Sequence, residues 1–170
     1  NPTFRPLVDA DVAGIHTSAL IGGRTKLPTG TTNFYSDASP TGCGGSGCLD
    51  TNNGLTSLTA KKTTLGALYG ILNGYDFTCT VSAQSVAKVN LLANEINVGV
   101  PVHFGPHDFN GACAGGSVIV DGGGFTLQND SGSNAPINAF FGPVFQIQNV
   151  ILANTSGPCV QLDEHATIRF

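Results

Sequence analysis

The sequence lacks methionine and tryptophan, and only 11% of its 170 residues are charged. It also lacks any apolar run close to the roughly 20 residues that cross a bilayer, so we expect no membrane insertion. Its seven Lys and Arg residues are dispersed, and the formal net charge is −4. Without a basic stripe, the chain has no electrostatic surface for DNA or RNA, and we expect no nucleic-acid partner.

The residues that are abundant favour turns and short strands. The chain holds 23 glycines and many Asn, Ser and Thr residues, and Phe is its main aromatic residue. This composition is typical of β structure with frequent turns, and the length fits a single domain.

The chain has five cysteines, an odd number, so at least one of them has no disulfide partner within the chain. Cys43 and Cys48 are separated by Gly-Gly-Ser-Gly and can close a small disulfide loop, whereas Cys79, Cys113 and Cys159 have no obvious partner in the sequence. The cysteines therefore do not indicate whether the protein works in an oxidising or a reducing compartment. A zinc site needs four ligands at compatible spacing, which the sequence does not offer, and we expect no cofactor.

The sequence divides into three parts. Residues 1–35 are polar and punctuated by Pro and Gly, and we interpret them as an extended arm that needs neighbours to hold it. Residues 36–76 contain a loop rich in turn formers and then a helix at about 60–72, where Leu65, Leu68, Tyr69 and Leu72 follow helical spacing. Residues 77–170 carry the strands.

Apolar and polar residues alternate in the third part, first at Phe77, Cys79 and Val81. The same alternation returns at 98–104, 125–128, 145–148, 160–163 and 166–170. The step from Cys79 to Val100 equals the step from Ile147 to Ile168, and both are close to the length of one coil of a solenoid, about 20 residues.

The pattern therefore predicts an all-β fold, a right-handed parallel β-helix with an N-terminal capping helix that plugs the open first coil. The competing fold is an antiparallel sandwich, which has strands every 8–12 residues.

Two segments resemble phage proteins. Residues 1–12, Asn-Pro-Thr-Phe-Arg-Pro-Leu-Val-Asp-Ala-Asp-Val, resemble an element at the joints of phage and prophage tail-fibre proteins. Residues 53–124, with Asn53-Gly54-Leu55-Thr56 before the helix, resemble the start of pectate-lyase-like β-helices. Residues 115–122 and 166–170 resemble coils of the same family.

The resemblance to tail-fibre and tailspike proteins implies a homotrimer on the surface or tail of a virion. The arm would attach it to other virion proteins, with Phe4, Arg5, Leu7 and Val8 as the attachment residues. The implied function is structural, in host attachment, and host surface glycan is a further candidate partner.

A catalytic role depends on a pair of carboxylates at a glycan groove. The acidic candidates are Asp108, Asp121, Asp130, Asp163 and Glu164, and no spacing among them singles out a pair. Asp121 precedes three glycines, which favours a turn in which its carboxylate accepts backbone N–H bonds. Asp163-Glu164-His165 lies between two expected strands, where solvated turn residues are common.

Other chemistry is weakly supported. His103, His107 and Asp108 are candidate ligands for a metal ion. We expect His103 to point outward from a strand and His107 to lie in the following loop, which does not favour a shared site. The resemblance to pectate-lyase-like proteins implies calcium-binding acidic clusters and a basic residue that abstracts a proton. Beyond the helix only Lys88 and Arg169 are available for that role, and neither has an acidic cluster nearby in the sequence. No nucleophile elbow or phosphate-binding loop is present.

The sequence therefore favours a non-catalytic structural protein of a phage virion. One alternative is a tailspike-type polysaccharide depolymerase with catalytic residues beyond Phe170 or between subunits. The other is a carbohydrate-binding adhesin in which Tyr35, Phe109 or Phe140 stacks on sugars.

Overall fold

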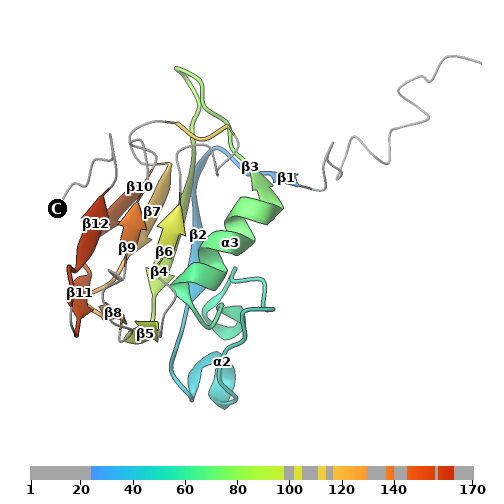
Figure 1. Ribbon diagram of the computed structural model, residues 1–170. Coiled ribbons are helices and arrows are strands. Elements are labelled where there is room, and N and C mark those ends of the chain that lie inside the picture. Colours follow the sequence, from blue (N-terminus) through green and yellow to red (C-terminus); the bar gives the residue numbers. More distant parts are fainter. Residues whose placement is uncertain are drawn as a thin grey trace, which may run out of the picture.

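The computed structural model describes residues 24–97, 102–104, 111–113, 117–129, 137–139, 145–155 and 157–162 (Figure 1). Short parallel strands lie beside one another, and the helix α3 packs at one side of them, at the right of the view in Figure 1. The C-terminal strands lie at the opposite side. Within these residues no helix is long and apolar enough to span a membrane.

The largest sheet has four parallel strands in the order β10-β7-β4-β2. They are β2 (Gly30–Ser36), β4 (Ser85–Leu91), β7 (Val118–Asp121) and β10 (Phe145–Gln148). In β4, buried and half-buried residues alternate without a break, because successive side chains of a strand point to opposite faces. The buried face of this sheet forms much of the core.

The remaining strands form three smaller parallel sheets. One contains β5 (Glu95–Asn97), β8 (Thr126–Asn129) and β11 (Ile151–Asn154), in the order β11-β8-β5. Another contains β6 (Val102–Phe104), β9 (Ile137–Ala139) and β12 (Val160–Leu162), in the order β12-β9-β6. The third pairs β1 (Thr25–Lys26) with β3 (Tyr75–Asp76).

The helix α3 (Thr64–Gly74) is part of the core and contacts β2, β4 and β6. Ala67, Leu68 and Ile71 are at most 2% exposed, whereas Tyr69 is 46% exposed. The expected apolar face is therefore rotated, because the small Ala67 allows close approach to the strands. One hydrophobic cluster joins helix and sheets: Leu27, Phe34, Ala67, Leu68, Ile71, Phe77, Ala87, Val89, Leu91, Val118, Val120, Leu127 and Ile147.

The predicted all-β, right-handed parallel β-helix is wrong for the described residues. They form short parallel strands in separate small sheets, and a helix shares their core. The strand register also lacks the expected constant repeat. Gly30 pairs with Ser85, Ala87 with Val118, and Val118 with Phe145, so the separation along the chain is longer than expected and shortens at each step.

Two boundaries also differ from the sequence-based expectation. The arm expected at 1–35 overlaps β2, whose seven residues all pair with β4; residues 1–23 lie outside the described part. The strand expected at 77–82 is instead a tight turn, in which the Thr80 N–H donates to the Ala83 carbonyl at 2.8 Å. Cys79 and Val81 are therefore exposed, and only Phe77 points into the core.

Candidate functional site

A row of polar side chains crosses the outer face of the four-stranded sheet. The strand register aligns Tyr35 of β2 with Asn90 of β4, Asp121 of β7 and Gln148 of β10. Lys88 lies two residues before Asn90 and therefore on the same face. This face holds the ion pair of Lys88 and Asp121, so we treat it as the first candidate site.

Asp121 is the centre of this row. Its Oδ2 lies 2.6 Å from Lys88 Nζ and accepts a hydrogen bond from Gln148 Nε2 at 2.9 Å. Its Oδ1 accepts from Asn149 Nδ2 at 3.2 Å and from the Gly123 N–H at 3.1 Å. The turn role that the sequence predicts for Asp121 is confirmed by the Gly123 contact, and the carboxylate also links three strands.

Two opposing effects act on the pKa of Asp121. Partial burial raises it, but hydrogen bonds from Lys88, Gln148, Gly123 and Asn149 outweigh burial and hold the pKa well below its usual value. A general acid or base works best with a pKa near the operating pH. Asp121 is therefore ionised and fully occupied, which suits a cross-strand link better than proton transfer.

Glu95 is a second acidic group, and it is 2% exposed. Its carboxylate accepts from the Thr64 backbone N–H at 2.7 Å and from Thr64 Oγ1 at 2.6 Å. Thr63 caps the same helix end by accepting from the Gly66 N–H at 2.8 Å. A carboxylate is favourable at a helix N-terminus, so Glu95 ties β5 to the start of α3.

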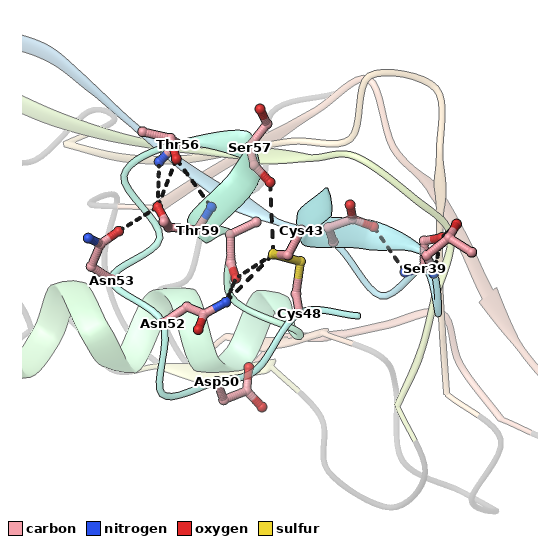
Figure 2. Close-up of a disulfide and its surroundings, with 12 residues drawn as sticks. Ser39, Cys43, Cys48, Asp50, Asn52, Asn53, Thr56, Ser57 and Thr59 are labelled. Atoms are coloured by element: carbon pink, nitrogen blue, oxygen red, sulfur yellow. Dashed lines mark hydrogen bonds between the residues drawn. A yellow bond between two sulfur atoms is a disulfide. The ribbon is translucent and has the colours of Figure 1, made fainter. Parts of the chain in front are cut away.

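The segment before α3 forms a small lobe closed by a disulfide (Figure 2). It contains α2 (Gly42–Gly45) and the 3₁₀-helix η1 (Ser57–Thr59). Cys43 and Cys48, the pair suggested by the sequence, are joined with a Cα–Cα distance of 5.2 Å. Beside this disulfide, Asn52 Nδ2 donates to the Ala60 carbonyl at 2.9 Å and to Cys43 Sγ at 3.6 Å (Figure 2).

A second disulfide joins Cys79 to Cys113, 34 residues apart, with a Cα–Cα distance of 5.1 Å. The sequence offered no partner for either residue, because their proximity depends on the turn at Thr80 and on strand pairing far along the chain. Cys159 is a free, exposed cysteine. Four of the five cysteines are thus bridged.

A cavity of about 1030 Å³ lies at the C-terminal side of the molecule. Its walls come from the turn after β7, from β10 and the turn after it, from β11 and from the start of β12; they include Gly123, Ile147, Gln148, Ile151, Leu152 and Cys159. None of the described residues that line it is charged. This described lining suits an apolar or neutral ligand, and it contains no acid–base pair.

No family model, curated protein or solved structure matches this chain.

Most residues singled out from the sequence lie outside the described part. These are Phe4, Arg5, Leu7, Val8, His107, Asp108, Phe109, Asp130, Phe140, Asp163, Glu164, His165 and Arg169. His103 falls in β6, of which only the backbone is described. Among the residues that are described, no three His, Cys, Asp or Glu side chains group as metal ligands.

Two functional contacts of the structure, at Lys88 and Glu95, were not predicted from the sequence. Lys88 had a usable signal, since Ala87, Val89 and Leu91 alternate with Val86, Lys88 and Asn90, and that pattern predicts a strand with an outward lysine. Glu95 had none, because its partner Thr64 is 31 residues away.

Proposed function

We propose that this chain is a non-catalytic structural component of a phage particle, a fibre or spike protein that contributes to attachment to the host surface. The observation that carries the proposal is that its buried and half-buried charged side chains hold structural elements together. Asp121 and Lys88 connect neighbouring strands, and Glu95 holds a helix end. Acidic groups occupied in this way support a rigid protein better than an enzyme.

The particle setting is supported by the two sequence resemblances. In this proposal Phe4, Arg5, Leu7 and Val8 attach the chain to other virion proteins, and the chain assembles as a homotrimer. Two disulfides in 170 residues suit a protein that works in an oxidising environment, such as the outside of a particle.

Incorporation into particles tests the proposal directly. Particles of the phage that carries the gene are purified and probed for this chain by peptide mass spectrometry and immunogold electron microscopy. We expect the chain on the particle surface. Leu7→Asp should abolish incorporation, and the matched control Asp9→Asn should leave it unchanged. Purified particles without the chain would refute the particle role.

A second candidate is carbohydrate binding, which one observation favours. Tyr35 stands half-buried in the row that continues through Asn90 and Gln148, so an aromatic ring and amide side chains share one face. Rings and amides together suit a sugar. On a glycan array Tyr35→Ala should lose binding, whereas Tyr69→Ala, on α3, should not. Shortening of a bound glycan would instead indicate a depolymerase.

A further inference from the structure

The lobe that precedes α3, residues 38–63, covers the edge of β2 that faces away from β4. The Tyr35 N–H donates to the Gly54 carbonyl at 2.8 Å, and the Lys61 N–H donates to the Tyr35 carbonyl at 2.9 Å. The other edge of β2 pairs with β4 along all seven residues. An uncovered strand edge presents backbone N–H and C=O groups to any extended chain. At Tyr35, β2 is therefore paired on both edges only while the lobe is in place.

The lobe has almost no apolar core of its own. The structure describes every residue of it, and its three leucines, Leu49, Leu55 and Leu58, are 60%, 42% and 68% exposed. The buried apolar side chains among residues 38–63 are those of Cys48 and Ala60. A segment that buries little apolar surface has a low local stability. The lobe therefore depends on its hydrogen bonds and on its disulfide (Figure 2).

The disulfide is a constraint that a reductant can remove. Cys43 is half-buried and the neighbouring Gly44 and Gly45 are exposed, so a small thiol can reach the bond. Cys43 also has a φ of 52°, in the left-handed region that costs free energy for a residue with a Cβ. Strained or exposed disulfides are the more easily reduced ones. A dithiol that gives up two electrons and two protons breaks the S–S bond, restores the thiols of Cys43 and Cys48, and becomes a cyclic disulfide itself.

The helix that follows the lobe has its own attachment to the core. Thr64 is fully buried, and Glu95 accepts hydrogen bonds from its N–H at 2.7 Å and from its Oγ1 at 2.6 Å. Leu68 and Ile71 lie in the hydrophobic cluster. None of these contacts involves the lobe. Opening of the lobe therefore leaves α3 in place and is a local event, separate from global unfolding.

We propose that the lobe is a redox-sensitive cover of the β2 edge. With the Cys43–Cys48 disulfide formed, the cover is closed; when the disulfide is reduced, the lobe opens and frees the backbone N–H and C=O of Tyr35. The opening goes beyond the proposed function and does not rest on it. In a virion protein the cover is open in the reducing cytoplasm where the chain is made and closed in the oxidising medium around the particle. The β2 edge can thus accept a further strand only before release.

Two backbone amides report on opposite edges of β2. The Tyr35 N–H faces the lobe, and the Leu92 N–H donates to the Ser36 carbonyl at 2.8 Å on the β4 side. Their hydrogen exchange is followed by NMR on the full chain, with and without dithiothreitol. We expect reduction to speed exchange at Tyr35 about tenfold or more, because the open lobe no longer protects it, and to leave exchange at Leu92 unchanged.

Two pairs of substitutions isolate the disulfide. Cys79→Ala with Cys113→Ala retains the Cys43–Cys48 disulfide, so dithiothreitol acts on the lobe alone and should speed exchange at Tyr35 as in the unmodified chain. Cys43→Ser with Cys48→Ser retains the other disulfide and should exchange rapidly at Tyr35 without any reductant. Mass spectrometry of alkylated thiols identifies the disulfide that has been reduced.

Two results would overturn the inference. Exchange at Tyr35 that neither reduction nor Cys43→Ser with Cys48→Ser accelerates would show that the lobe stays closed without its disulfide. Equal acceleration at Tyr35 and Leu92 would show that reduction unfolds the sheet instead of opening the lobe. Neither result depends on the particle experiment, since a chain that is absent from particles loses the role of the compartment and keeps the cover.

Discussion

At the scale of single residues, Asp121 makes stability depend on pH. Its pKa in the folded protein lies below the value of about 3.9 for an unfolded chain, so folding favours the ionised form. Its contribution is therefore complete above about pH 5 and is lost as the pH falls toward the folded pKa. Asp121→Asn should cost about 1–3 kcal/mol at neutral pH.

The measurement for Asp121 is urea unfolding from pH 7 down to pH 3. The difference in stability between the unmodified chain and Asp121→Asn should shrink as the pH falls, because the Asp121 carboxyl then takes up a proton in the unfolded chain while it stays ionised in the folded protein. Since other carboxylates titrate in both proteins, the difference isolates Asp121. A difference that is constant with pH would show that folding does not lower the pKa of Asp121.

Glu95 shows what a buried carboxylate does at a helix end. Removing it by Glu95→Ala leaves the Thr64 N–H and hydroxyl without this acceptor and opens space in the interior, which should cost about 3 kcal/mol. Glu95→Gln keeps one acceptor oxygen and should lose clearly less. Thermal unfolding followed by circular dichroism measures both, and equal losses would show that the charge alone matters.

At the scale of elements, the turn after β7 depends on close backbone contact. The Gly122 N–H donates to the Gln148 carbonyl at 2.9 Å, and a Cβ on Gly122 would lie 2.5 Å from Val150 Cα. Gly122→Ala should therefore cost about 1–3 kcal/mol through overpacking. Gly74→Ala is the control, since a Cβ there has nothing within 4 Å. Chemical denaturation compares the two; equal stability would contradict the contact.

The two disulfides should contribute differently to the free energy of unfolding because they close loops of different length. Cys79 and Cys113 are 34 residues apart, and Cys43 and Cys48 are 5 apart. Loop-closure entropy gives about 4 kcal/mol for the longer loop and about 2 kcal/mol for the shorter one. Cys79→Ala with Cys113→Ala should thus lower the melting temperature more than the double change at Cys43 and Cys48. The opposite order would assign the greater role to the lobe.

Local patterns were informative about elements but not about their pairing. Helical spacing located a helix near 60–72, observed as α3 (Thr64–Gly74), and alternation at Phe145–Gln148 matches β10. Alternation at Phe77, Cys79 and Val81 misled, because a turn of polar Thr and Ser residues has the same period. The predicted repeat of about 20 residues was wrong because many strands share the same alternation of apolar and polar residues. Which strands pair, and in which register, is decided by tertiary contacts. For the same reason the Cys79–Cys113 disulfide and the contact between Glu95 and Thr64 could not be predicted from the sequence.

At the scale of the whole molecule, the formal net charge of −4 bears on the homotrimer that we propose. Copies of the chain that each carry −4 repel at long range, and salt screens that repulsion. Association should therefore strengthen when the ionic strength rises from about 0.01 M to about 0.15 M, where the Debye length falls from about 30 to about 8 Å. Sedimentation equilibrium over this range of salt measures the trend. Association that weakens steadily with salt would show that ion pairs between the copies outweigh the repulsion of their net charges.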